Sequence, residues 1–121
     1  MTITEYLRRS ILTNCGYQEN NQRKPSLESL RETEWSSEFE KHMRERLIMG
    51  GIRYGLLHEP GKPKYDRIQS AIKRLEKYRQ TGNLENLVDI ANMCLLEFEE
   101  GEHPNRHFKS IDDGEHTEVK R

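Results

Sequence analysis

Residues 84–100 read LENLVDIANMCLLEFEE, and this stretch decides the fold class. Its apolar residues recur at the spacing of one helix face. The resulting inward stripe comprises Leu84, Leu87, Val88, Ala91, Leu95 and Phe98. Three more apolar residues, Ile90, Met93 and Leu96, lie outside this stripe. A helix that is apolar on more than one side is typical of a bundle centre or of a subunit interface.

A second helix is predicted from Ser37 to about Tyr54. Ser37 and Glu40 have the spacing of a capping box, which marks a helix start. The predicted core stripe of this helix comprises Phe39, Met43, Leu47, Gly50 and Tyr54. Because glycine weakens a helix, the pair Gly50-Gly51 predicts either a close helix crossing or a break.

Between these two helices, a loop containing Gly55, Pro60, Gly61 and Pro63 precedes a third helix at residues 65–80. We expect its inward face to consist of Tyr65, Ile68, Ile72 and Leu75. Its outward face would then carry Arg67, Lys73, Arg74 and Lys77. Gly82 is expected to end this helix in a left-handed cap, and Asn83 to cap the next one.

The two ends of the chain are polar. Residues 2–12 predict a short amphipathic helix opened by Thr2 and Glu5, and a helical turn is expected at residues 26–34. The sequence therefore predicts three parts: an N-terminal helical arm and linker (1–25), a helical core domain (26–101) and an irregular polar tail (102–121).

Composition indicates how the core is completed. Of the 121 residues, 32% are hydrophobic and 34% are charged, whereas an average globular domain is about 45–50% apolar and about 25% charged. A small domain with few core-forming residues buries little surface by itself. We therefore expect an all-α bundle of about four helices that is completed by oligomerisation, as a dimer or tetramer.

Charge and cysteine content exclude several classes of protein. Twenty basic and 21 acidic residues are interspersed, which argues against a general nucleic-acid-binding domain. No run approaches the roughly 20 apolar residues of a membrane helix, and no secretory leader is recognisable. With only two cysteines, Cys15 and Cys94, we expect a cytoplasmic protein with free thiols. Cys94 is expected in the core.

The helix at 84–100 also carries candidate metal ligands. Glu85, Asp89 and Asn92 fall on one flank of its apolar stripe. Oxygen ligands of this kind suit Mg²⁺, which is often held by one or two carboxylates together with substrate phosphates. The alternative is an ordinary solvated edge of an amphipathic helix.

Side chains of the helix at 37–54 extend this set. Arg46 and Arg53 border its core stripe, where arginines pair with carboxylates or hold phosphate. Glu40 lies on the other flank of the stripe and Glu38 lies further round the helix; either is a candidate to face the acids of the helix at 84–100.

Histidines in the tail suggest a separate possibility. His103 and His107 have helical zinc-ligand spacing, and His116 follows downstream. Pro104 argues against a helix there, so a polar tail is the alternative.

Several positions between residues 36 and 100 form a pattern. They are Arg53-Tyr54-Gly55, Tyr65, Ala71-x-x-Arg74-Leu75-x-x-Tyr78 and Thr81-Gly82-Asn83-Leu84-Glu85-x-Leu87-x-Asp89-x-x-Asn92. In this pattern the chain resembles the MazG-like, all-α nucleoside triphosphate pyrophosphohydrolases, including the phage-type dATP/dGTP diphosphohydrolases. These families commonly hold Mg²⁺ with one Glu-x-x-Glu and one Glu-x-x-Asp. Asp89 matches the second motif, but Asn86 stands three positions before it and Glu85 is one residue away; the first motif is absent in strict form.

The resemblance implies an oligomeric helical bundle that hydrolyses a nucleoside triphosphate to the monophosphate and pyrophosphate with Mg²⁺. The implied catalytic residues are Glu85 and Asp89. The metal ligands would come from Glu38, Glu40, Glu85, Asp89 and Asn92. Substrate would contact Arg53, Tyr54, Arg74 and Tyr78.

Two alternatives remain open. The chain could bind nucleotide without cleaving it, or it could be a non-catalytic helical interaction or accessory protein, encoded by a phage or within an operon.

Overall fold

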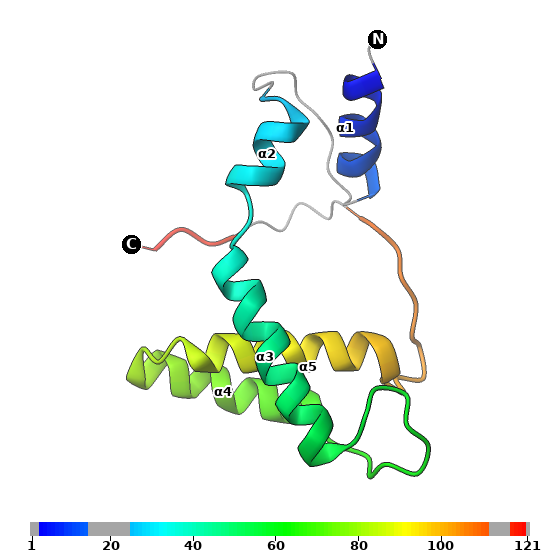
Figure 1. The fold of residues 1–121 in the computed structure, drawn as a ribbon, viewed down its shortest axis with the longest axis vertical. Helices are drawn as coiled ribbons and strands as arrows, with labels where there is room; N and C mark the ends of the chain where they lie inside the picture. The colour runs from blue at the N-terminus through cyan, green and yellow to red at the C-terminus, as the bar shows by residue number, and fades with distance from the viewer. Residues whose placement is uncertain (1–2, 15–24, 112–116, 121) are drawn as a thin grey trace. The chain divides into compact units, whose positions relative to one another are not determined.

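The computed structural model describes residues 3–14, 25–111 and 117–120. Within them it has five α-helices and no strand (Figure 1). The helices are α1 (Ile3–Asn14), α2 (Leu27–Thr33), α3 (Ser37–Tyr54), α4 (Arg67–Thr81) and α5 (Glu85–Glu100). The predicted all-α fold class is therefore confirmed. No helix in this described part of the chain is long and apolar enough to cross a bilayer.

The chain divides into two compact units, and all residues of the candidate site lie in the unit spanning Ser36–Arg106. The other unit, residues 1–35 and 107–121, contains α1 and α2. In α2, the hydroxyl of Ser26 accepts a hydrogen bond from the backbone N–H of Ser29 at 3.1 Å and so caps the helix. Thr2, the predicted start of the N-terminal helix, lies outside the described residues.

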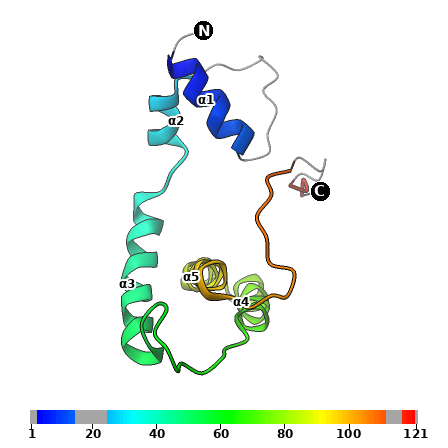
Figure 2. The same ribbon diagram turned by 90° about the vertical axis from the view of Figure 1, so that its right-hand side faces the viewer.

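Three helices build the unit that contains the site. α4 and α5 run antiparallel and side by side, and α3 crosses α5 (Figures 1 and 2). Gly82 ends α4 in the left-handed conformation (φ 71°), as predicted. The N-cap of α5 is Leu84 and not the predicted Asn83, although the side chain of Asn83 accepts a hydrogen bond from the backbone N–H of Glu85 at 3.1 Å. This tight connection places the start of α5 beside the end of α4.

The start of α3 differs by one residue from the prediction. The cap is Ser36, whose hydroxyl accepts a hydrogen bond from the backbone N–H of Phe39 at 3.0 Å. The helix continues through Gly50 and Gly51 to Tyr54, so the predicted break is absent. A Cβ at Gly50 would meet no atom within 4 Å, so no close crossing is present there either.

Gly50 therefore offers a test of the stability of α3. We expect Gly50→Ala to stabilise the protein by about 0.5–1 kcal/mol, because alanine loses less conformational entropy in a helix. Gly82→Ala is the matched control and is expected to destabilise, since the φ of Gly82 is positive. Urea denaturation would measure both variants. Destabilisation by Gly50→Ala would contradict the open space seen at that position.

Packing on α4 departs most from the sequence pattern. The predicted inward residues Ile68, Ile72 and Leu75 remain 57%, 49% and 49% exposed. Arg67, predicted to point outward, has only 14% of its side chain exposed. Arg74 likewise turns toward α5, because its guanidinium pairs with a carboxylate of that helix. The apolar stripe of α4 is thus only about half covered inside this unit.

The interior of the described residues is correspondingly small. Among the residues whose burial the structure describes, Val88 is the only buried apolar side chain, and the polar Asn86 and Asn92 of the same helix are buried as well. Leu84 and Phe98, predicted in the inward stripe of α5, are exposed. Cys94 is a free, exposed thiol, so its predicted core position is wrong.

Candidate functional site

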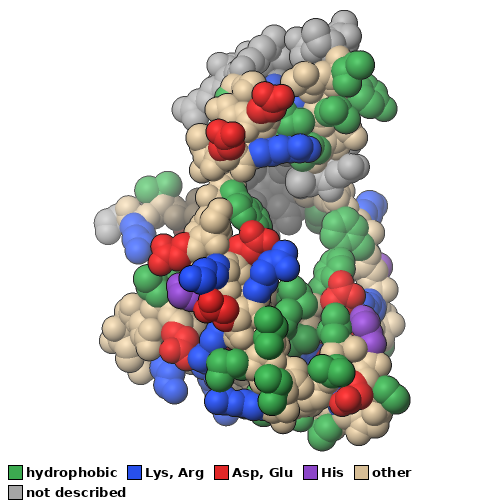
Figure 3. Space-filling model, viewed as in Figure 1, with side chains coloured by type: hydrophobic (Ala, Val, Ile, Leu, Met, Phe, Trp, Pro, Cys, Tyr) green, Lys and Arg blue, Asp and Glu red, His purple; other side chains and the backbone are tan. Residues whose placement is uncertain are grey.

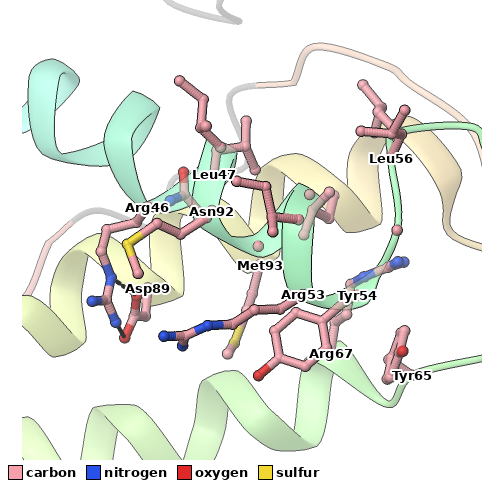
Figure 4. Close-up of a pocket in the computed structure, with 18 of the residues that line it drawn as sticks. Arg46, Leu47, Arg53, Tyr54, Leu56, Tyr65, Arg67, Asp89, Asn92 and Met93 are labelled. Carbon is pink, nitrogen blue, oxygen red and sulfur yellow. Dashed lines mark hydrogen bonds and ion pairs between the residues drawn. The ribbon is translucent and has the colours of Figure 1, made fainter.

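A cavity of about 810 Å³ lies between α3 and the α4–α5 pair, and the loop after α3 completes its wall (Figure 4). We call it the basic groove. Its basic lining residues are Arg44, Arg46, Arg53, Lys62, Arg67 and Arg74. Its acidic ones are Asp89 and Glu100. The lining residues thus carry six positive charges and two negative ones, and Glu40 and Glu85 outside the lining pair with Arg44 and Arg46. The remaining positive excess favours an anionic occupant.

Asp89 lies at one end of the basic groove, between two arginines. Its Oδ1 accepts a hydrogen bond from Arg46 Nε at 3.2 Å, and its Oδ2 lies 3.4 Å from Arg46 Nη2 (Figure 4). Arg74 Nη1 is 3.0 Å from the same Oδ2. Only 12% of the Asp89 side chain is exposed. One carboxylate of α5 therefore fixes guanidinium groups from both α3 and α4.

Arg46 also joins Asp89 to Glu85. Its Nη2 lies 2.6 Å from Glu85 Oε1, and about half of the Glu85 side chain is exposed. The hydrogen bond to Asp89 is the main cause that raises the pKa of Arg46, with both carboxylates adding to it. The two carboxylates thus stabilise the charged form of Arg46, which arginine already adopts at physiological pH.

Glu100 organises the opposite end of the groove. It accepts hydrogen bonds from Lys62 Nζ at 2.9 Å, from the backbone N–H of His58 at 3.0 Å, and from Arg67. The Lys62 hydrogen bond is the main cause that lowers the pKa of Glu100. These contacts fasten the loop after α3 to the end of α5, and they fix the wall of the groove.

Between these ends lie an unpaired cation and an aromatic pair. Within the described part of the chain, Arg53 makes no ion pair, and it lines the groove. Tyr54 and Tyr65 pack edge to face, with ring centroids 5.8 Å apart. Figure 4 places Arg53 and Tyr54 together, with Tyr65 beside them. A polyanion with an attached planar ring would find charge and aromatic surface close together here.

Asn92 lies on α5, one turn beyond Asp89, and is 7% exposed. Its Nδ2 donates a hydrogen bond to the backbone oxygen of Met43 at 2.9 Å, which links α5 to α3. Its Oδ1 has no hydrogen-bond partner. Asn92 also lines the groove, while its Oδ1 is itself buried.

The other predicted site residues, Glu38, Glu40 and Tyr78, do not line the basic groove, although Glu40 pairs with the lining residue Arg44. Glu40 pairs with Arg44 at 3.0 Å, and Glu38 lies 3.8 Å from His42, both within α3. Tyr78 is half-buried and does not line the groove. In the described ranges, no three His, Cys, Asp or Glu side chains form a group suited to a metal ion. Among the described residues, neither Glu38 nor Glu40 therefore forms the predicted metal-binding group with Glu85 and Asp89.

The tail shows no helix at the histidines that the structure describes. Residues 104–105 form a turn, and His103 Nδ1 accepts a hydrogen bond from the backbone N–H of Asn105 at 3.0 Å. This agrees with the effect expected of Pro104. His116 lies outside the described residues.

Sequence reasoning missed Lys62, Arg67 and Glu100 as site residues. A signal for Arg67 was present, because residues 67, 71, 74 and 78 recur at helical spacing and form the less exposed side of α4. A stripe that mixes arginine with alanine and tyrosine cannot be recognised from the sequence as a packed face of a helix. This side of α4 packs against α5 because Arg67 and Arg74 pair there with Glu100 and Asp89.

Comparisons with protein-family models, with curated proteins and with solved structures found no match to this chain. What the basic groove binds must therefore be argued from its own residues.

Proposed function

We propose that the basic groove binds a nucleoside triphosphate, and that the protein hydrolyses it to the monophosphate and pyrophosphate with Mg²⁺. The observation that supports this most is the excess of basic side chains, six against two, in one cavity of about 810 Å³. Pockets of this size suit small-molecule ligands. A triphosphate would supply a negatively charged partner for Arg53, which makes no ion pair among the described residues, and could share the arginines that Asp89 holds.

The proposed phosphate contacts are Arg46, Arg53 and Arg74. Arg53 is available as it stands, whereas Arg46 and Arg74 are held in place by Asp89. Guanidinium groups fixed in this way lose little entropy when they bind phosphate oxygens. Tyr54 and Tyr65, with apolar neighbours such as Met93, would pack against the base.

Glu85 and Asp89 are the carboxylates that would hold Mg²⁺. Two carboxylates are a suitable number and type of ligand for this ion, because Mg²⁺ is often bound by one or two carboxylates plus substrate phosphates. Both also contact Arg46 in this structure, so Mg²⁺ would share these carboxylates with that guanidinium. When bound, Mg²⁺ would neutralise phosphate charge and make an attacking water more acidic.

We further propose that the protein acts as a homo-oligomer in the cytoplasm, where nucleotides are available. Support comes from the half-exposed Ile68, Ile72 and Leu75 of α4 and from Ile52 of α3, which is 81% exposed. In the space-filling view, charged side chains cover the first half of α3 and hydrophobic ones gather around its second half (Figure 3). Apolar groups at this level of exposure favour burial against another copy.

Nucleotide binding without hydrolysis is the second candidate. It is favoured by the fact that both oxygens of Asp89 already accept hydrogen bonds from arginine. An assay of pyrophosphate release from common and modified triphosphates, with Mg²⁺ or Mn²⁺, separates the two. Release supports the enzyme. Binding without release supports the second candidate.

Thermal unfolding tests the binding itself. A triphosphate at 100 times its dissociation constant should stabilise the native protein by about 2.7 kcal/mol. We expect the melting temperature to rise with nucleotide, to rise further with nucleotide plus Mg²⁺, and to stay nearly unchanged with Mg²⁺ alone. The last expectation follows because the arginines occupy the carboxylates in the absence of phosphate. No shift with millimolar nucleotide would contradict the proposed function.

A further inference from the structure

Glu100, at the end of the basic groove away from Asp89, has no acceptor left for a ligand. Lys62 Nζ lies 2.9 Å from its Oε1 and 3.0 Å from its Oε2. Oε1 also accepts a hydrogen bond from Arg67, and Oε2 accepts one from the backbone N–H of His58 at 3.0 Å. A carboxylate has about four lone-pair sites, and these hydrogen bonds occupy them. The carboxylate that lines this end of the groove is therefore fully used.

Arg67, by contrast, has unused donors. Its Nη2 donates to Glu100, while its Nη1 lies 4.0 Å from Glu97 Oε2, beyond the range of a hydrogen bond. Among the described residues, neither Nε nor Nη1 of Arg67 makes a hydrogen bond, and neither atom is buried. Arg67 lines the groove, and a guanidinium can only donate. The charged groups at this end therefore offer a ligand donors rather than acceptors.

The aromatic pair proposed to pack against the base lies at the same end of the groove. Figure 4 shows Tyr54 and Tyr65 with Arg67, on the side away from Asp89. Along α5, Glu100 follows Asp89 by about three turns, which is roughly 16 Å at the rise of an α-helix. With the phosphates on the arginines at Asp89, the base would lie near Arg67, and its hydrogen-bonding edge would face a donor.

We propose that Arg67 donates a hydrogen bond to a carbonyl oxygen on the edge of the base, so that the groove prefers a triphosphate of a 6-oxo purine, such as guanine or hypoxanthine, over one of the 6-amino purine adenine. This rests on the proposed nucleotide binding and names its substrate class. The amino group of adenine is itself a donor, so it would face a guanidinium instead of an acceptor. A site that hydrogen-bonds one group discriminates strongly against an analogue that leaves its polar groups unpaired.

Two nucleotides with the same sugar and phosphates test this preference on the wild-type full chain. Inosine triphosphate has a carbonyl oxygen at position 6 of the purine, where adenosine triphosphate has an amino group. Isothermal titration would be done in EDTA, which removes any contribution from a metal ion. We expect inosine triphosphate to bind about 10- to 100-fold more tightly, the effect of one hydrogen bond to a charged group. Equal affinities, or tighter binding of adenosine triphosphate, would overturn the proposal while leaving nucleotide binding intact.

Arg67→Met tests whether this residue causes the preference, because methionine has a long side chain without a donor. We expect the variant to bind inosine triphosphate no better than adenosine triphosphate, and to bind inorganic tripolyphosphate as the wild type does. Arg79→Met is the matched control and should keep the full preference. Arg79 lies on the same helix, but its side chain is 80% exposed and it does not line the groove. Circular dichroism would check the helix content of both variants.

Three further results would count against the proposal. A preference for inosine triphosphate that survives Arg67→Met would overturn the role of Arg67. An equal loss of affinity for inosine triphosphate and tripolyphosphate in this variant would overturn it too, since Arg67 would then act on phosphate binding. If neither tripolyphosphate nor any nucleotide binds the wild type, the proposed function fails, and this inference fails with it.

Discussion

Asp89→Ala is expected to lower pyrophosphate release by about 100-fold or more, with little change in helix content. The magnitude is that of removing one preorganised electrostatic group from an active site. Asp89 would contribute twice, because it positions Arg46 and Arg74 for the phosphates and provides a carboxylate for Mg²⁺. Steady-state assays with Mg²⁺ would give the activity, and circular dichroism would check the fold.

Glu97→Ala is the matched control for this variant. Glu97 is also a carboxylate of α5 near an arginine, 4.0 Å from Arg67, but it does not line the basic groove. We expect it to keep its activity within about 2-fold, because its contact with Arg67 is long and Arg67 keeps Glu100 as its close partner. Full activity in Asp89→Ala, or equal losses in both variants, would contradict the role assigned to Asp89.

Asp89→Asn separates the two contributions. Asparagine keeps the shape and one acceptor oxygen but removes the charge that holds both guanidinium groups. If Asp89 positions the arginines, the variant should bind nucleotide more weakly even in EDTA. If it serves only as a metal ligand, affinity in EDTA should stay unchanged or rise, because the arginines are released. The titration therefore shows which contribution dominates.

Local signals in the sequence predicted most of the helix ends. Ser26, Gly82 and Gly101 mark boundaries because the hydrogen bonds or dihedral angles at a helix end depend on nearby residues. The cap of α3 was misplaced by one residue because Ser36 and Ser37 are both able to cap, and the pattern with Glu40 favoured the second. Errors of this kind stay small, since the competing residues are neighbours.

Which face of α4 packs was not predictable in this way. Periodicity identified the stripe of Ile68, Ile72 and Leu75, and apolar burial would normally turn it inward. The structure instead turns Arg67 and Arg74 toward Glu100 and Asp89. Those ion pairs join residues far apart in the sequence, so no local pattern reports them. The same is true of the pairing of Arg46 with Asp89, and hence of the site itself.

The exposed stripe of Ile68, Ile72 and Leu75 leads to the second large expected effect, which is on self-association of the chain. Ile72→Glu is expected to weaken self-association by about 100-fold or more, if Ile72 lies at the centre of a subunit interface. Within a single chain the substitution should change stability by only about 0.5 kcal/mol, because Ile72 is half-exposed there. A large effect on assembly with a small effect on the monomer is therefore the signature of an interface.

Sedimentation of the wild type over a range of concentrations would give the mass of the assembly, and the same experiment with Ile72→Glu would give its loss. Gln80→Glu is the matched control, since it adds the same charge at an exposed position of α4 outside the apolar stripe. A wild type that sediments as a single chain at all concentrations would contradict the proposed oligomer. Dissociation by Gln80→Glu to the same extent would mean that charge alone opposes association. Dissociation by Ile72→Glu alone would locate the interface on the stripe that the sequence predicted to be buried.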